Sequence, residues 1–160
     1  YKNTKIILSS ENFMNIDKTF GEKIPNVQYY DREGAYLIVI QKGKAATVRT
    51  PKGHFLIGGG IKDGETHIQC IERESLEEIG YHTVVQQYIC SAEMYVQHET
   101  LGYFHPIQHY YAGELTGKPL ASAESDHVFE WISLNEIEEK MFVKAQSWAL
   151  KYYLSKFVKR

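Results

Sequence analysis

Hydrophobic residues in the first half of the chain gather in short runs whose length is typical of β-strands. The run AYLIVI at 35–40 lies between Gly34 and Gly43, a pattern that predicts a strand buried on both faces. Residues 45–50 favour a second strand that returns beside the first, and residues 54–57 favour a third, short strand. A β-sheet is therefore expected to form the first part of the fold.

A helical pattern replaces the strand pattern after the glycine tract at 58–60. Thr66 followed by Gln69 has the spacing of a capping box, which marks the start of a helix, and Gly80 marks its end. Apolar residues recur between these positions at spacings that place them on one side of the helix. The residues predicted to form this buried side are Ile68, Ile71, Leu76 and Ile79.

Strands return in the second half of the chain, and a long helix closes it. Residues 83–97 and 103–115 predict two long strands, and residues 128–132 predict a last one. Ser133 is suited to cap a short helix, and residues 141–158 have the pattern of an amphipathic helix. The residues expected on its buried side are Phe142, Ala145, Ala149, Tyr152, Tyr153 and Phe157. Strands interleaved with two or three helices predict an α/β fold, in which helices cover both faces of a mixed sheet.

The length of 160 residues, with 43% hydrophobic residues, suits one globular domain with a single core. Residues 1–34 show no persistent period and are predicted to be an N-terminal segment, with or without one short strand. Residues 35–160 would then form the domain. The N-terminal segment could supply a homodimer contact, although the sequence leaves the oligomeric state open.

The charge of the chain disfavours some classes of partner. A formal net charge of -2 gives no general attraction to nucleic acid polymers or to anionic membranes. No apolar run approaches the roughly 20 residues that span a bilayer, and the N-terminus lacks a signal-like pattern, so a cytoplasmic location is the simplest interpretation. The two cysteines, Cys70 and Cys90, lack CxxC spacing and are predicted to be buried free thiols.

The predicted helix before Gly80 carries three carboxylates, Glu74, Glu77 and Glu78, at spacings that place them on a single face. Like charges this close repel one another, and a hard divalent cation that prefers oxygen ligands would compensate them. For the three glutamates alone, a solvated acidic face is the alternative. The glycine tract just before the helix adds main-chain groups where a metal ion and a phosphate could meet, which favours a metal site for a diphosphate.

The stretch GGIKDGETHIQCIERESLEEIGY at 59–81 resembles the Nudix box, which is a glycine, five residues, a glutamate, seven residues and then REUxEExGU, with U a bulky aliphatic residue. Every fixed position of the box is matched at the correct spacing. The matching residues are Gly59, Glu65, Arg73, Glu74, Glu77, Glu78 and Gly80. A looser resemblance extends from Ala35 to Leu134 and includes FEWISLNEI at 129–137, which is similar to many MutT-like members of the family.

The resemblance implies a single-domain Nudix fold and a site for Mg²⁺ or Mn²⁺. The residues that would bind the metal are Glu74, Glu77, Glu78 and, through its carbonyl oxygen, Gly58. Arg73 and Glu65 would hold the loop and the helix in register through an ion pair. Two departures from the family pattern could loosen the loop or shift the helix: Ile57 stands where the family usually has proline, and Ser75 where it has an aliphatic residue.

The box does not fix the general base, because members that resemble this chain take it from different places. Glu74 is one candidate and Glu93, Glu99 and Glu124 are others, of which Glu93 is preferred because its strand should pass the metal face. The residues predicted to contact the substrate are Gly59, Gly60, Arg49 and Tyr95. The seven histidines show no paired zinc spacing, and most are predicted to be surface or packing residues.

The sequence therefore predicts a MutT-like pyrophosphohydrolase that cleaves a diphosphate linkage in a small nucleotide, either a nucleoside triphosphate or another nucleoside diphosphate derivative. Downstream residues that mark the ADP-ribose, NADH and dinucleoside polyphosphate hydrolases of the family are missing or misplaced, which leaves the triphosphate class by default. One alternative is a Nudix-fold nucleotide-binding or regulatory module without turnover. Another is a dinucleoside polyphosphate or nucleotide-sugar hydrolase.

Overall fold

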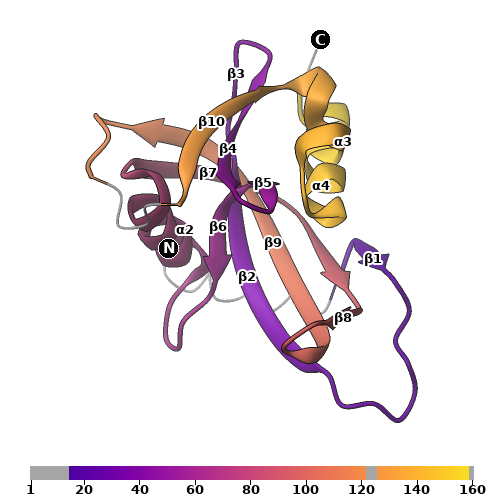
Figure 1. The fold of residues 1–160 in the computed structure, drawn as a ribbon. Helices are drawn as coiled ribbons and strands as arrows, with labels where there is room; N and C mark the ends of the chain where they lie inside the picture. The colour runs from indigo at the N-terminus through magenta and orange to yellow at the C-terminus, as the bar shows by residue number, and fades with distance from the viewer. Residues whose placement is uncertain (1–14, 122–125, 159–160) are drawn as a thin grey trace.

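A computed structural model of the chain describes residues 15–121 and 126–158 (Figure 1). The strands are β1 (Lys18–Phe20), β2 (Tyr30–Ile38), β3 (Ile40–Gln41), β4 (Lys44–Thr50), β5 (Gly53–Phe55), β6 (Ile57–Gly60), β7 (His82–Met94), β8 (Val96–His98), β9 (Gly102–Thr116) and β10 (Val128–Ser133). The helices are α2 (His67–Ile79), the short 3-10 helix η1 (Leu134–Glu136), α3 (Ile137–Lys140) and α4 (Lys144–Lys156). None of the helices within these two ranges is long and apolar enough to cross a membrane.

The strands form two sheets. In the six-stranded sheet the order is β1-β7-β9-β2-β6, with β8 paired to one end of β9. β1 pairs with β7 and β2 pairs with β9 in parallel, whereas the other pairs are antiparallel, so the predicted mixed sheet is confirmed. The remaining strands form a four-stranded sheet in the order β10-β4-β3, with β5 paired to β4, and the sequence pattern does not distinguish this sheet from the first.

Helices cover both faces of the larger sheet, with α2 on one side and α4 on the other (Figure 1). Alternate residues of β2 divide between the two faces. Leu37 packs in one cluster with Ile71 and Ile79 of α2, whereas Ile38 packs in the other cluster with Leu150 of α4. The α/β arrangement expected from the sequence, with the sheet between helices, is therefore confirmed.

Two strands begin within the predicted N-terminal segment. β1 pairs in parallel with the end of β7, with Lys18 opposite Ala92, and β2 already begins at Tyr30, before the apolar run at 35–40. The first residues of β2 are polar and exposed, which is why hydrophobic patterning places the start of this strand too late. Residues 1–14 of the segment lie outside the described residues.

The ends of α2 are where the sequence predicts them. The side chain of Thr66 accepts a hydrogen bond from the backbone N–H of Gln69 and completes the capping box. Gly80 ends the helix in the left-handed conformation, at φ 73°, and a Cβ there would overlap the carbonyl oxygen of Leu120. Only glycine fits this position.

The buried side of α2 differs from the prediction. The residues buried on the helix are His67, Cys70, Ile71, Ser75, Glu78 and Ile79. The prediction that Ile68 and Leu76 are buried is wrong, because the helix rests on the sheet with the side that also carries Glu78. The hydroxyl of Ser75 donates to the carbonyl oxygen of Tyr81 at 2.7 Å, so the polar group that departs from the family pattern is satisfied by a hydrogen bond.

Cys70 and Cys90 are buried and free, as predicted.

α4 begins at Lys144, later than the predicted start at Met141. Met141 and Phe142 instead lie alongside β5. Met141 forms a β-bridge with His54, and the N–H of Phe142 donates to the carbonyl oxygen of His54 at 3.0 Å. The helix buries Ala145 and Ala149, as predicted. The prediction is wrong for Phe142 and Phe157, which are 53% and 38% exposed.

A buried hydrogen-bond network joins α4 to the strand region before the glycine tract. The side chain of Gln146 accepts from the N–H of Leu56 at 2.8 Å and donates to Oε1 of Gln108 at 3.2 Å. The hydroxyl of Tyr110 donates to the same Gln108 oxygen at 2.7 Å. Because Leu56 directly precedes β6, α4 supports the strand that carries the glycines.

Replacing Gln146 with leucine should therefore destabilise the fold. The change leaves the N–H of Leu56 without its partner in a buried site, which we expect to lower the free energy of unfolding by about 1–3 kcal/mol. Urea unfolding followed by circular dichroism measures the loss. Gln86→Leu makes the same change at an exposed position of β7 and should shift the free energy by less than about 0.5 kcal/mol. Equal losses in the two variants would contradict a stabilising role of the network.

Candidate active site

β6 brings the glycine tract close to its neighbours. The strand pairs with β2 in antiparallel fashion, with Gly58 opposite Tyr36 and Gly59 opposite Ala35. Gly58 has a φ of 145°, and a Cβ there would overlap the carbonyl oxygen of Ala35. Ile57, the residue that replaces the usual proline, is fully buried in the cluster beneath α2. The tract therefore permits an approach of two main chains that a side chain would prevent.

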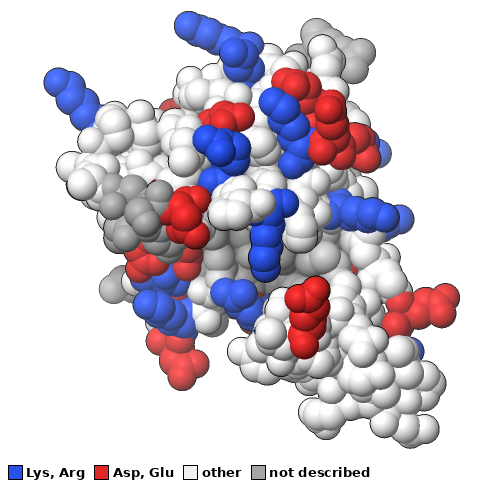
Figure 2. Space-filling model, in the orientation of Figure 1, with Lys and Arg blue, Asp and Glu red and all other residues white. Residues whose placement is uncertain are grey.

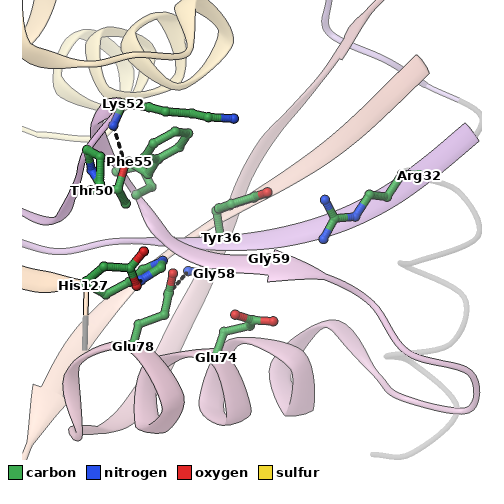
Figure 3. A pocket seen from close by; sticks show the side chains of 13 residues that line it. Arg32, Tyr36, Thr50, Lys52, Phe55, Gly58, Gly59, Glu74, Glu78 and His127 are labelled. Atoms are coloured by element: carbon green, nitrogen blue, oxygen red, sulfur yellow. Dashed lines mark hydrogen bonds and ion pairs between the residues drawn. The ribbon is translucent and has the colours of Figure 1, made fainter. Parts of the chain in front are cut away.

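Two of the three box glutamates lie against this tract (Figure 3). Glu78 is 7% exposed, and its Oε1 accepts a hydrogen bond from the N–H of Gly58 at 3.1 Å. A Cβ on Gly59 would lie 2.6 Å from the carboxyl carbon of Glu74, so the glycine leaves room for that carboxylate. The side chain of Glu77 is 38% exposed and lies 3.2 Å from Arg73. The structure thus groups Glu74 and Glu78 at the tract, with Glu77 farther out on the same helix.

Arg73 and Glu65 join the loop to α2. Arg73 donates through Nε to Oε2 of Glu65 at 2.7 Å and through Nη2 to Oε1 at 3.0 Å, which is a bidentate ion pair. It also donates to the carbonyl oxygen of Gly60 at 3.0 Å and to Glu74 at 2.8 Å. The hydrogen bonds from Arg73 lower the pKa of the Glu65 carboxyl to about 2, and the pair raises the pKa of Arg73. The contact that the Nudix resemblance implies is therefore present.

A cavity of about 540 Å³ opens beside the glycine tract (Figure 3). Its acidic lining residues on α2 are Glu74 and Glu78. Its basic lining residues are Arg32 from β2 and Lys52 from the turn between β4 and β5. Tyr36 and Phe55 add aromatic surface, and His127 lies just before β10. The cavity thus combines carboxylates, cations and aromatic rings.

Arg32 is a lining residue that the sequence pattern does not indicate. A Cβ on Gly60 would lie 2.5 Å from Nε of Arg32, so the guanidinium lies close over the glycine tract. Within the described residues this guanidinium makes no hydrogen bond or ion pair, which leaves it available to an anionic ligand. The alternation of side chains along β2 could have identified it. Once the strand is extended back to Tyr30, Arg32 lies on the same face as Tyr36.

Glu93 does not line this cavity, although the sequence favours it as a base. Ala92 and Met94 pack in the cluster that faces α4, so Glu93, which lies between them on β7, points to the face that α2 covers. The prediction requires β7 to pass the glycine tract, but β9 and β2 lie between β7 and β6 in the sheet. The contacts of Glu93 are with the hydroxyls of Thr19 at 2.8 Å and Tyr95 at 3.2 Å and with Nε2 of His105 at 2.7 Å.

Three other candidate residues, Tyr95, Arg49 and Glu99, also lie outside the cavity. Tyr95 stacks on His105 with ring centroids 4.3 Å apart, outside the cavity. Arg49 also lies outside it, because it donates to Glu130 on the neighbouring strand at 2.9 Å. Glu99 lies in the turn after β8. Glu124 falls outside the described residues.

The cations that line the cavity do not belong to a larger basic patch on the face shown in Figure 2. The face of the molecule shown in Figure 2 carries Lys and Arg side chains interspersed with Asp and Glu, without an extended patch of one sign. Electrostatic attraction on this face is therefore concentrated where individual cations border a hollow, which suits a small anionic ligand.

A family model of the NUDIX domain matches residues 25–153, so the chain belongs to the Nudix family. Its fold is that of MutT-like Nudix hydrolases. The Nudix hydrolase from Nitrosomonas europaea is 19% identical with a TM-score of 0.68, over 79% of this chain and 90% of that one. The MutT Nudix hydrolase from Burkholderia pseudomallei is 19% identical with a TM-score of 0.65, over 77% and 98%. The MutT protein from Methanosarcina mazei is 16% identical with a TM-score of 0.66, over 84% and 100%. A comparison with curated proteins finds no match.

Removing the Glu65 carboxylate should destabilise the chain in a pH-dependent way. The pKa of Glu65 falls from 4.5 to about 2 on folding, so its ion pair stabilises the fold fully above pH 4.5, and the contribution is lost as the pH falls towards 2. The difference in free energy of unfolding between the native chain and Glu65→Gln should shrink across this window. Urea unfolding at a series of pH values measures it, with Glu114→Gln at an exposed position of β9 as control. A difference that does not change with pH would contradict the ion pair.

Proposed function

We propose that this Nudix hydrolase is a pyrophosphohydrolase that cleaves a diphosphate linkage in a nucleoside triphosphate or another nucleoside diphosphate derivative. The observation that carries the proposal is the presence of both signs of charge around one cavity. Glu74 and Glu78 lie on the helix below it, and Arg32 and Lys52 lie on other sides (Figure 3). An acidic surface alone would repel a phosphate, whereas carboxylates that hold a divalent cation, together with free cationic side chains, suit a phosphate chain.

The donor set fits the divalent metal that Nudix hydrolases generally use. Carboxylate oxygens of Glu74 and Glu78, with the carbonyl oxygen of Gly58, are the hard ligands that Mg²⁺ and Mn²⁺ prefer. The space over Gly59, which a Cβ would fill, lets the Glu74 carboxylate approach the main chain. Glu77 is the third carboxylate ligand in this proposal. When bound, the metal would polarise the phosphate oxygens and stabilise the charge that develops on them.

The remaining groups of the cavity would hold the nucleotide. The Arg32 guanidinium can donate two parallel hydrogen bonds to a phosphate, and Lys52 can add a second positive charge. Burial raises the pKa of Tyr36, so its phenol stays protonated and can donate a hydrogen bond. Phe55 packs against Phe142 with ring centroids 5.4 Å apart and offers an apolar surface for a base or a sugar.

Glu74 is the general base that the geometry favours. It lines the cavity, whereas Glu93 lies outside it, on a strand that β9 and β2 separate from β6. Nη1 of Arg73 donates to Oε1 of Glu74 at 2.8 Å and orients the carboxylate. A carboxylate held in this way can accept the proton of the attacking water as the bond to phosphorus forms.

Glu74→Gln should remove most turnover. Loss of a positioned base lowers kcat by about 10²–10⁴-fold, and Glu78→Gln should also lower activity strongly because it removes a metal donor. Release of phosphate or pyrophosphate with Mg²⁺ is measured across nucleoside triphosphates, nucleoside diphosphate sugars and dinucleoside polyphosphates. Glu114→Gln, the same change at an exposed site on β9, should retain the native rate.

Each outcome of this panel assigns a function. Equal rates in the native chain, Glu74→Gln and Glu78→Gln would refute the catalytic assignment. Tight nucleotide binding without turnover of any compound would favour a nucleotide-binding or regulatory module. Turnover confined to dinucleoside polyphosphates or nucleotide sugars would replace the triphosphate class.

Arg32→Gln should weaken substrate capture more than Arg49→Gln does. Arg32 borders the cavity, so its loss removes a charged hydrogen bond to phosphate worth about 1.5–3 kcal/mol, or roughly 10- to 100-fold in kcat/KM. Arg49 pairs with Glu130 outside the cavity, so its substitution should leave kcat/KM nearly unchanged. Steady-state kinetics on the best substrate of the panel compares the two. A larger effect at Arg49 would restore the assignment made from the sequence.

A further inference from the structure

A second cluster of metal-binding side chains lies between the start of α2 and the larger sheet. Glu33 belongs to β2, His67 is the first residue of α2, and His109 belongs to β9. One ligand atom of each residue lies within 4.8 Å of the others. These residues are far apart in the sequence, and none of them lines the cavity that holds Glu74 and Glu78.

The distances within the cluster are close to those of a tetrahedral metal site. Oε1 of Glu33 lies 3.2 Å from Nε2 of His67 and 2.8 Å from Nε2 of His109. Ligand atoms bound to one zinc ion at about 2.0 Å are roughly 3.3 Å from one another. The two imidazole rings stack with centroids 4.4 Å apart and 24° between their planes. A modest rotation of the rings would direct both Nε2 lone pairs at one point.

His109 has a polar side chain whose hydrogen bonding is incomplete. The residue is fully buried, and within the described part of the chain neither ring nitrogen makes a well-directed hydrogen bond, despite the short contact with Glu33. A buried polar group without a well-directed partner is unfavourable. A cation held between this ring and Glu33 would satisfy both groups.

His67 already has the orientation of a metal ligand. Its Nδ1 lies 2.7 Å from the hydroxyl of Tyr111, and its Nε2 faces Glu33. With Nδ1 as the donor, the hydrogen bond to Tyr111 leaves the Nε2 lone pair for a metal, and metal-binding histidines commonly use their second nitrogen in this way.

We propose that Glu33, His67 and His109 form a second metal site, selective for Zn²⁺ or a similar borderline-soft divalent ion. Two imidazoles and one carboxylate suit zinc and leave a fourth position for water, which can reach the site because the Glu33 side chain is 35% exposed. The oxygen donors of the box glutamates prefer harder ions such as Mg²⁺, so ligand chemistry separates the two sites. His67 and Glu74 are two turns of α2 apart, about 10 Å. The metal would link the start of α2 to β2 and β9.

The test is Zn²⁺ binding by the full chain in excess Mg²⁺. After dialysis the native chain should retain about one equivalent of Zn²⁺ by elemental analysis. Zn²⁺ at roughly 100 times its Kd should also raise the midpoint of thermal unfolding by about 5–10 °C. His67→Asn should lose both effects. Glu78→Gln and His82→Asn should keep them, since the first changes the other site and the second removes an exposed imidazole.

A second variant covers the case in which His67→Asn does not fold. Tyr111→Phe keeps all three ligands but removes the hydrogen bond to Nδ1, and it should weaken Zn²⁺ binding about 10- to 100-fold. In the native chain, Co²⁺ should give the intense visible absorption of a four-coordinate site. Equal Zn²⁺ binding by the native chain and Tyr111→Phe, or loss of Zn²⁺ in Glu78→Gln, would overturn the proposal. The cluster would then be a hydrogen-bonded group of Glu33 and the two histidines without a metal.

Discussion

The close packing of the glycine tract against β2 and α2 is the constraint on which the rest of the structure depends. At Gly58 the main chain runs so near Ala35 that no side chain fits, and at Gly59 the Glu74 carboxylate occupies the space of the missing side chain. This contact fixes the distance between the helix that carries the carboxylates and the sheet that carries Arg32. A larger residue at either glycine would separate the two halves of the site before it affected any ligand directly.

The same region has to accommodate several negative charges in a small volume. Arg73 reduces the repulsion between these charges, because its guanidinium contacts Glu65, Glu74 and Glu77 together. Its partners lie on the loop and on the helix, so balancing the charges also fixes the geometry of the loop. A single arginine therefore offsets the repulsion that would otherwise oppose the formation of the acidic face.

Local signals in the sequence predicted the features that depend on local physics. The capping residue Thr66 and the terminal Gly80 delimit α2 correctly, because caps act within one turn of the helix. Features that depend on strand limits and strand order are harder to predict. Polar residues at the start of β2 hide Arg32 from hydrophobic patterning, and the pattern of β7 does not show that two strands separate Glu93 from the glycine tract. The approach of His109 to the start of α2 depends on the pairing of β9 with β2, which no local pattern specifies.

The acidic and basic residues around the cavity are anchored in different ways. Glu74 and Glu78 lie on a helix that is capped at both ends and packed against β6. Lys52 lies in a turn, and His127 lies in the segment that enters β10, which are the kinds of position where homologous proteins most readily change. Substrate choice can therefore diverge through changes in connecting segments while the helix that carries the box glutamates is inherited intact. Such a scaffold can give rise to enzymes for different nucleotides without the rebuilding of its reactive centre.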